Sequence, residues 1–324
     1  MESFHFNQSM LGHITNAPKA SLSRAISNLD VTPIVSDSGH NRKFDIENIR
    51  KVTDVIYASN NRPIKQKVQV FYNFKGGTGK TSLCFQVATH LALLGFKVLS
   101  IDLDPQAHLS SVLGITEDQN CLTAYDILIN DTNVKDALIN IFPGLDLIPS
   151  NISLTRVEIP LNAKNRREEK LKNVIDSLRL EYDYIILDTN PTISTLNMNA
   201  LVASDRINIV CETQPFSLAG LRVLVDELEK FYADMGIIPH YCIIPNKYEI
   251  KTATAQEVLG ALRAEYGNMV QNTIIRKSEE INIASKKKLP IAAFCKSKSA
   301  SFEDILDLVH EIVRISRLDF NVGE

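Results

Sequence analysis

The stretch VFYNFKGGTGKTSLCFQVATHLALLGFKVLSIDLDPQ, residues 70–106, decides the fold of this 324-residue chain. It opens with an apolar and aromatic run that predicts a β-strand, and it continues into the glycine-rich turn KGGTGKT. From about Lys80 onward, apolar residues recur at the spacing of one helix face: Leu83, Val87, Leu91 and Leu94. The segment therefore predicts a strand, a glycine-rich loop and a helix in succession.

The turn has the composition of a phosphate-binding loop. Glycines let successive N–H groups curl around an anion, and the N-terminus of the following helix adds its dipole. In such a loop Lys80 neutralises charge on the β- and γ-phosphates, and the hydroxyl of Thr81 can hold Mg²⁺. The ordinary pattern G-x-x-x-x-G-K-[ST] requires glycine at position 74, where this chain has Phe74, and a second lysine, Lys75, heads the loop instead. The loop indicates a nucleoside triphosphate site of an unusual kind.

The chain after the loop alternates short β-branched runs with longer helical stretches. Strands that are apolar on both faces and separated by helices predict a parallel sheet covered on both sides. We therefore expect an α/β fold with a doubly wound, mostly parallel sheet. After the opening strand, VQVFYN, the expected strands are KVLSIDLD, LDLIPS, YDYIILDT, INIVCE, YCIIPNK and NTIIR.

Three motifs in this order, KGGTGKT, IDLDPQ and YDYIILDTNP, resemble the ParA/MinD family of ATPases, whose phosphate-binding loop is the deviant Walker A motif with an extra lysine. The chain is most similar to ParA-type partition ATPases of the large form, which carry an N-terminal helix-turn-helix DNA-binding domain. The resemblance extends by order and spacing from residue 67 to about residue 316. It implies ATP and Mg²⁺ as cofactors and a weak ATPase activity that a partner stimulates.

The resemblance also implies roles for individual residues. Lys75 would reach across a nucleotide-sandwich dimer to the partner's phosphates, and Asp104 would position the attacking water, so that Lys75, Lys80 and Asp104 are the expected catalytic residues. Metal binding would involve Thr81, Asp188 in the Walker B position, and Asp102, which supports either Mg²⁺ or the loop. Asn246 would read the adenine edge, although it is equally well an ordinary turn residue. The expected nucleotide-binding residues are Gly76, Gly77, Thr78, Gly79, Lys80, Thr81, Ser82 and Asn246.

One position departs from the family pattern. Relatives read D-x-P-P after the Walker B strand, whereas this chain has Asp188-Thr189-Asn190-Pro191. In relatives this loop senses the γ-phosphate. The replacement of a proline by Asn190 is therefore expected to soften the switch.

Composition limits the possible functions. With Lys+Arg 35 against Asp+Glu 38 the formal charge is −3, which excludes a globally basic nucleic-acid coat but leaves room for a local basic patch. The five cysteines are dispersed without metal-like spacing, and they are interpreted as reduced, buried thiols. No apolar run approaches the roughly 18 residues of a membrane helix. A soluble, cytoplasmic protein that associates with the nucleoid is expected.

The N-terminal part of the chain differs in composition from the rest. Residues 1–60 are predicted to form a small, mainly α-helical helix-turn-helix or winged domain, residues 61–66 a linker, and residues 67–324 the ATPase domain. A short helix is expected from about Ser21, with Leu22, Ile26 and Leu29 on one face. A second is expected after an Asp45 N-cap, with inward residues Ile46, Ile49, Val52, Val55 and Ile56. A docking or dimerisation arm is the alternative to a DNA-binding domain.

Two sets of residues are candidates for DNA binding. The most basic window of the chain lies within residues 276–298, where a solvated charge run is the alternative; its members are Arg276, Lys277, Lys286, Lys287, Lys288, Lys296 and Lys298. The N-terminal set would contact an operator and comprises Arg24, Arg42 and Lys43, with His40 and Asn41 beside them.

The function expected from the resemblance is DNA partition of a plasmid or chromosome. ATP would drive homodimerisation and nonspecific DNA binding, and a ParB-like centromere-binding partner would stimulate hydrolysis and release. Repression of the protein's own operon would accompany it. Two alternatives remain: a transcriptional repressor with nucleotide as a switch, and a MinD-like membrane-associated ATPase. The amphipathic segment FEDILDLVHEIVRISRL favours a helix packed on the sheet over a membrane helix because its polar face is largely acidic.

Overall fold

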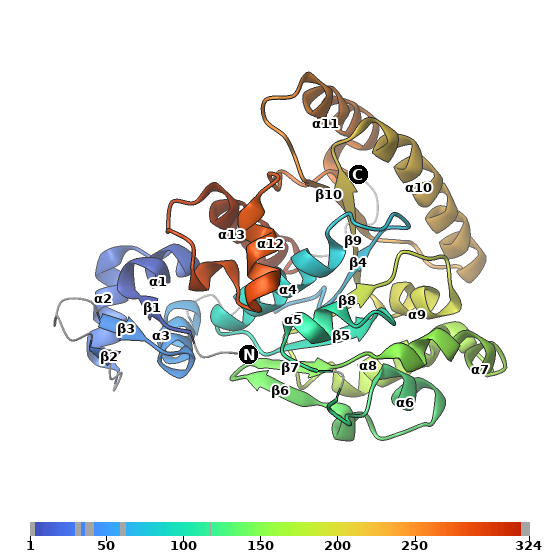
Figure 1. The fold of residues 1–324 in the computed structure, drawn as a ribbon, viewed down its shortest axis with the longest axis horizontal. Coiled ribbons are helices and arrows are strands. Elements are labelled where there is room, and N and C mark those ends of the chain that lie inside the picture. The colour runs from blue at the N-terminus through green and yellow to red at the C-terminus, as the bar shows by residue number, and fades with distance from the viewer. Residues whose placement is uncertain (1–3, 30–33, 36–41, 59–62, 117, 319–324) are drawn as a thin grey trace.

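The computed structural model describes residues 4–29, 34–35, 42–58, 63–116 and 118–318. Its centre is a seven-stranded sheet of order β10-β9-β4-β8-β5-β7-β6 (Figure 1). All neighbours pair in parallel except β6, which runs antiparallel to β7 at the edge. The strands are β4 (Val68–Tyr72), β5 (Val98–Leu103), β6 (Ile139–Phe142), β7 (Leu145–Ile148), β8 (Tyr184–Thr189), β9 (Arg206–Glu212) and β10 (Tyr241–Asn246).

The sheet confirms the predicted fold class and corrects two details. The segment NTIIR, residues 272–276, is not a strand: only its last residue, Arg276, forms an isolated bridge, to Tyr248, and Val270 before it forms another, to Ile243. The edge strand β6 was not predicted. This edge strand is only partly buried, and its four residues do not form the continuous apolar run that identifies the central strands.

Helices cover both faces of the sheet. On one face α4, α5, α12 and α13 pack on strand residues such as Phe71, Tyr184 and Ile186. On the other face α6 to α11 pack on their alternates, such as Val70, Ile185 and Leu187. The helices of this domain are α4 (Lys80–Leu93), α5 (His108–Val112), α6 (Ala124–Ile129), α7 (Glu158–Asn162), α8 (Lys170–Leu178), α9 (Thr195–Ala203), α10 (Pro215–Met235), α11 (Ala253–Tyr266), α12 (Glu279–Lys287) and α13 (Ala300–Ile315), with 3₁₀ turns at residues 134–137, 152–156, 167–169, 267–269 and 291–293.

The described N-terminal residues form a small unit beside this domain, at the left of Figure 1. A three-stranded sheet of order β1-β3-β2 packs with three helices. The elements are β1 (Phe6–Asn7), α1 (Gln8–Thr15), α2 (Lys19–Asn28), β2 (Ile34–Val35), β3 (Arg42–Phe44) and α3 (Ile46–Ala58).

Both helices predicted in this unit are present. The prediction was wrong about Val55 and did not include α1. Asp45 does cap α3, since its Oδ1 accepts a hydrogen bond from the N–H of Asn48 at 2.9 Å. Val55 was expected to face inward but is 49% exposed, whereas Ile49 and Val52 on the same helix are buried. Helix α1 was missed. It is held at its start by Asn7, whose side chain accepts a hydrogen bond from the N–H of Met10.

The N-terminal unit shares a hydrophobic core with the large domain. Buried residues of α1, α2 and α3 belong to the same cluster as those of α4 and α13. The ring of Phe4 meets that of Phe142 edge to face, with centroids 6.0 Å apart. Lys65 and Gln66, the described end of the expected linker, both donate backbone hydrogen bonds to the carbonyl of Ser316. The unit is therefore packed against the domain in this structure.

Arg50 of α3 makes the most specific contact of this junction. Its guanidinium donates to three carbonyls at the end of α4, those of Ala92 (2.6 Å), Gly95 (2.9 Å) and Phe96 (3.0 Å). It also fills the space beside Gly144, where an added Cβ would overlap Nη1 of the guanidinium. A cation at a helix C-terminus is favoured by the helix dipole and by the carbonyls that lack helical partners.

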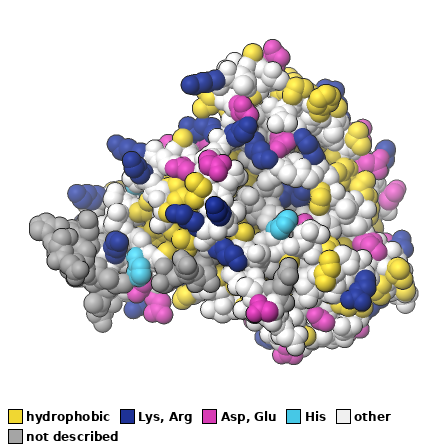
Figure 2. Space-filling view, in the orientation of Figure 1, with side chains coloured by type: hydrophobic (Ala, Val, Ile, Leu, Met, Phe, Trp, Pro, Cys, Tyr) yellow, Lys and Arg dark blue, Asp and Glu magenta, His cyan; other side chains and the backbone are white. Residues whose placement is uncertain are grey.

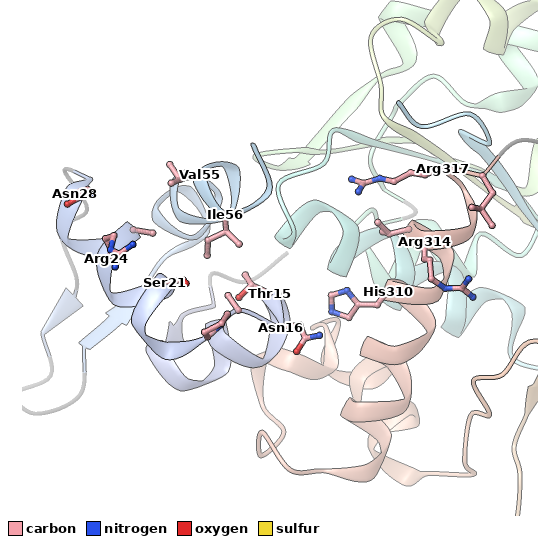
Figure 3. A pocket seen from close by; sticks show the side chains of 15 residues that line it. Thr15, Asn16, Ser21, Arg24, Asn28, Val55, Ile56, His310, Arg314 and Arg317 are labelled. Atoms are coloured by element: carbon pink, nitrogen blue, oxygen red, sulfur yellow. The ribbon is translucent and has the colours of Figure 1, made fainter. Parts of the chain in front are cut away.

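A cavity of about 870 Å³ opens between the N-terminal unit and α13 (Figure 3). Thr15, Asn16 and Ser21 lie on one side of it, and His310 and Arg317 on the other (Figure 3). Its described lining also includes Arg24 and Arg314 and contains no carboxylate side chain. This part of the junction is therefore open and basic.

Helix α13 packs against the domain as the sequence favoured. Its apolar residues, among them Phe302, Ile305 and Val309, are buried. Two acidic residues of this helix, Asp304 and Glu311, are buried as well: Asp304 pairs with Arg276, and Glu311 accepts hydrogen bonds from backbone N–H groups of Asn272 and Thr273. Among the described residues, no helix has both the length and the apolar character needed to cross a membrane.

The Arg50 contact predicts how the junction responds to substitution. Arg50→Ala should lower the free energy of unfolding by about 2 kcal/mol, because three carbonyls lose a charged donor and a cavity is left beside Gly144. Lys51→Ala, at the next and exposed position of α3, is the matched control and should change it little. Urea unfolding measures both. Equal effects of the two substitutions would contradict the proposed anchor.

Candidate functional site

The glycine-rich loop joins β4 to α4 at the carboxyl edge of the sheet. Gly79, at φ +95°, forms the N-cap of α4, and no side chain among the described residues caps this helix. An added Cβ at Gly79 would lie 2.5 Å from Nδ2 of Asn246, so this position requires glycine. The N–H groups of the first turn of α4 are therefore left for an anion.

Lys80 is the first residue of α4, and its side chain folds back over the loop. Its Nζ lies 3.4 Å from the carbonyl oxygen of Lys75. The residue is buried, and burial lowers the pKa of Lys80, while the nearby carboxylates of Asp188 and Asp104 oppose that shift. Lys80 is thus held among loop carbonyls and carboxylates, where a bound polyphosphate would meet it.

Parallel pairing of β5 with β8 brings two of the predicted aspartates together. Asp102 and Asp188 are direct partners in the register, and both are fully buried. Burial raises the pKa of Asp188, and the neighbouring Asp102 raises it further. Oδ2 of Asp188 has no hydrogen-bond partner among the described residues. One oxygen of Asp188 is therefore available to a ligand at this edge of the sheet.

Asp102 differs from Asp188 in its hydrogen bonds. Its Oδ2 accepts from the N–H and the hydroxyl of Ser110 at 2.8 and 2.7 Å, and its Oδ1 accepts from the N–H of Asp104 at 3.0 Å. These bonds tie the end of β5 to α5. The sequence left two roles open for Asp102, support of Mg²⁺ or support of the loop. These contacts favour support of the loop.

Asp104 lies just beyond β5 and is 8% exposed. Its Oδ1 accepts a hydrogen bond from the N–H of Gln106, and its backbone carbonyl accepts one from the hydroxyl of Ser150. The turn after it includes Ala107 at φ +53°. Asp104 is thus fixed at the same edge of the sheet as Lys80 and Asp188.

The donor set fits Mg²⁺ bound jointly by protein and phosphate. The hydroxyl of Thr81 opposes the rise in the pKa of Asp188, so it lies near the carboxylate whose Oδ2 lacks a partner among the described residues. No group of three or more His, Cys, Asp or Glu side chains that could hold a metal occurs in the described part of the chain. Mg²⁺ characteristically binds through one or two protein oxygens, with water and phosphate completing its coordination.

Asn190, the departure from the family pattern, is a hydrogen-bonding centre of the loop after β8. Nδ2 of Asn197 in α9 donates to both the carbonyl and Oδ1 of Asn190, at 3.0 and 2.9 Å. The N–H and hydroxyl of Thr192 also donate to Oδ1. A proline could accept none of these side-chain hydrogen bonds. Asn190 therefore holds the loop through side-chain hydrogen bonds to Thr192 and Asn197.

The loop is also held from β9 and β10, by residues that the sequence analysis missed in part. Asn246 is buried; its Nδ2 donates to the carbonyl of Thr78 at 2.7 Å, and its Oδ1 accepts from the N–H of Lys247 at 2.9 Å. Glu212, at the end of β9, pairs with both Lys75 and Lys247. Glu212 is a charged residue that closes an apolar strand, as Asp188 is, and this position is the signal that would have identified it.

The basic window separates into paired and exposed cations. Arg276 is bound to the buried Asp304 at 2.6 Å, and Lys277 pairs with Glu249 at 2.7 Å. Nζ of Lys287 lies 5.1 Å from the centre of the Phe294 ring. Lysine and arginine side chains gather on the face formed by α12 and α13 in Figure 2. Lys286, Lys287, Lys296 and Lys298 are exposed, and Lys288 is half-buried.

The N-terminal candidates lie in different places. Arg24 is exposed on α2 and lines the cavity beside α13. Arg42 and Lys43 lie in β3, where Lys43 is exposed. His40 and Asn41 lie outside the described residues. This set belongs to the N-terminal unit, separate from the phosphate-binding loop.

Comparison with known proteins places the chain among partition proteins. The family model described as an AAA domain matches residues 66–237. The cell division protein PomZ of Myxococcus xanthus is 34% identical over 248 residues, which cover 76% of this chain and 77% of PomZ. The chromosome partitioning protein ParA of Caulobacter vibrioides is 30% identical over 255 residues, covering 78% of this chain and 95% of that protein.

A solved structure supports the fold independently. The ATP complex of a Cyanothece McdA variant superimposes with a TM-score of 0.70 at 20% identity, over 77% of this chain and 97% of that chain. Residues 1–65 precede the segment that the family model matches. The N-terminal unit is therefore outside the part of the chain that the family match covers.

The two cross-strand aspartates predict opposite responses in the nucleotide-free protein. Asp188→Asn should raise the free energy of unfolding at pH 7.5 by about 1 kcal/mol, because it removes a buried carboxyl group whose ionisation is opposed by burial and by the neighbouring Asp102. Asp102→Asn should lower it by about 2 kcal/mol, because an amide NH₂ would face the donors of Ser110 or Asp104. Urea unfolding compares them. A loss of stability in Asp188→Asn as large as that in Asp102→Asn would contradict this assignment.

Proposed function

The chain belongs to the ParA family of partition ATPases, and from this premise we propose that it is a DNA-partition ATPase of a plasmid or chromosome, acting in the cytoplasm on the nucleoid. ATP binding drives formation of a homodimer that holds DNA nonspecifically. Hydrolysis, stimulated by a ParB-like centromere-binding protein, releases the DNA. Nucleotide hydrolysis thus times attachment and release.

The observation that carries this proposal is the combination of Lys75, Lys80, Asp104 and Asp188 at one edge of the sheet. A phosphate-binding loop alone is compatible with many nucleotide-dependent functions. A second lysine at the head of the loop, half exposed at the surface, is suited to meet the nucleotide of another copy. Together with the partition proteins among the relatives, this second lysine favours a dimerising switch.

The residues of the site have separate tasks in hydrolysis. The loop N–H groups and the N-terminus of α4 bind the phosphates, and Lys80 neutralises charge on the β- and γ-phosphates. Asp104 orients the water that attacks the γ-phosphorus, while the bond from that phosphorus to the β–γ bridging oxygen breaks and ADP leaves. Lys75 of the opposite copy stabilises the charge that develops on the leaving oxygen. Mg²⁺, held through Thr81 and Asp188, supplies further charge stabilisation when bound.

An operator-binding role is favoured by the N-terminal unit. Helices α1 and α2 are joined by a three-residue connection, and β2, β3 and α3 follow, which is the order expected of a winged helix-turn-helix domain. Arg24 is exposed on α2, the second helix of the pair. We propose that this unit contacts operator DNA and makes the protein a repressor of its own operon. Packing of α13 on the domain makes the membrane-associated alternative the weaker one.

The first test measures retention on nonspecific DNA with ATP, with ADP and without nucleotide. The native protein should be retained selectively with ATP. Lys80→Ala should lose this selectivity and about a hundredfold of its turnover, because a charge that stabilises the transferred phosphate is gone. Lys230→Ala, which changes an exposed lysine on α10, is the control for loss of one positive charge. Retention that ignores nucleotide would overturn the partition cycle and favour the repressor, to be tested on promoter DNA with ADP.

The exposed lysines in α12 and in the segment after it predict the salt dependence of DNA binding. Lys286→Glu with Lys298→Glu should weaken ATP-dependent retention and reduce the slope of log K against log salt by about 2, since each phosphate contact contributes about 0.9. Lys172→Glu with Lys230→Glu makes the same change in net charge on α8 and α10. A salt titration of both double variants decides the matter. Equal slopes for the two would remove this surface from the DNA site.

A further inference from the structure

Glu212 joins two lysines at the mouth of the phosphate-binding loop. Its Oε2 lies 2.7 Å from Nζ of Lys75, and its Oε1 lies 2.8 Å from Nζ of Lys247. The carboxylate is only 8% exposed, whereas the two lysine side chains are 47% and 39% exposed. One inward-facing acid therefore draws two outward-lying cations onto the loop.

Lys247, which directly follows β10, is bound to the phosphate-binding loop. Nζ of Lys247 also donates to the carbonyl of Gly77, and the backbone of Lys247 is in the left-handed region at φ +54°. The residue before it, Asn246, donates to the carbonyl of Thr78. Carbonyls that would repel a phosphate are thus covered from the β10 side. Lys247 is consequently fixed from two directions, by Glu212 and by the loop.

Lys75 is held differently. Its N–H donates to Oδ1 of Asn73 at 2.9 Å, which fixes its backbone, but its ammonium group is directed by Glu212. A side chain that is half exposed and bound by one carboxylate exchanges that partner at small cost. Lys75 is therefore the movable member of the group and Lys247 the fixed one.

The charges favour an exchange when a polyphosphate arrives. Burial alone would raise the pKa of Glu212, but the hydrogen bonds from Lys247 and Lys75 hold it below its ordinary value, so the group is a carboxylate at neutral pH. A triphosphate in the loop brings several negative charges close to that carboxylate. Repulsion between them weakens the hold on Lys75, and the phosphates offer the ammonium group stronger acceptors.

We propose that Glu212 is a positioning residue that holds Lys75 on its own protomer until the triphosphate is bound, and then releases it toward the nucleotide of a second copy. This inference rests on the proposed dimerising ATPase. Lys247 keeps its bond to Glu212 and prevents the carboxylate from being left buried without a partner. Glu212 thereby sets the ATP concentration at which two copies associate.

The hold on Lys75 can be measured without any activity. Reductive methylation of the nucleotide-free protein, followed by mass spectrometry, gives the relative rate of modification at each lysine. Glu212→Gln should raise the rate at Lys75 about fivefold, the factor that corresponds to about 1 kcal/mol of ion pairing. Glu212→Asp, which keeps the charge, should stay closer to the native rate. Lys277, exposed and paired with Glu249, is the internal reference.

The effect on association is measured by light scattering during an ATP titration. Glu212→Gln should form dimers at an ATP concentration several-fold lower than the native protein, because Lys75 is already free. In a Lys75→Ala background the same substitution should give no such shift. The KM for ATP should fall more than kcat changes, since Glu212 acts on association through Lys75.

The outcomes separate this inference from the proposed function. An unchanged methylation rate at Lys75 in Glu212→Gln, or an equal shift with and without Lys75, overturns the role of Glu212. If methylation responds as expected but neither the native protein nor any variant associates with ATP, the dimerising ATPase is overturned, and the release step fails with it. A several-fold shift that depends on Lys75 supports both.

Discussion

Parallel pairing of β4 with β8, and of β8 with β5, is the constraint on which the rest of the structure depends. Parallel strands end at one edge of the sheet, so three chemically different signals that are distant in sequence meet there. The glycine-rich loop follows β4, Asp188 closes β8, and Asp102 lies opposite it near the end of β5. Because the register pairs Asp102 with Asp188, two buried carboxylates lie next to each other. Repulsion between them raises the pKa of Asp188.

The site resolves these charges unequally. Asp102 is satisfied by Ser110 and by the N–H of Asp104, while one oxygen of Asp188 is left without a partner among the described residues. Buried groups in this condition are costly to the folded protein and favour any ligand that can satisfy them. The positive charges of the site are also paired: Lys80 is buried near these carboxylates, and Lys75 and Lys247 share Glu212. The free protomer is therefore balanced by internal ion pairs that a charged ligand can replace.

The N-terminal unit adds a second level of organisation. It has its own small sheet, yet its helices contribute to the core that α4 and α13 form, and Arg50 binds the end of α4. The phosphate-binding loop lies at the other end of that same helix. Helix α4 thus adjoins the phosphate-binding loop at its N-terminus and the N-terminal unit at its C-terminus. The open, basic cavity beside α13 shows that the junction is incompletely filled.

The sequence by itself determined the loop, the strands with apolar residues on both faces and the packing of α13 on the domain. It also determined that aspartates stand at strand ends. These features follow from local composition and periodicity. Only the tertiary structure decided which groups those residues meet. NTIIR is as apolar as a strand but lies beside the sheet, and Val55 has helical spacing but faces solvent, since burial depends on what packs opposite. Arg276 counted as a free cation in sequence but is bound to Asp304, and Glu212 gained its two lysines from the residues that follow β4 and β10. Charge pairing across strands depends on register and distance, which no local pattern encodes.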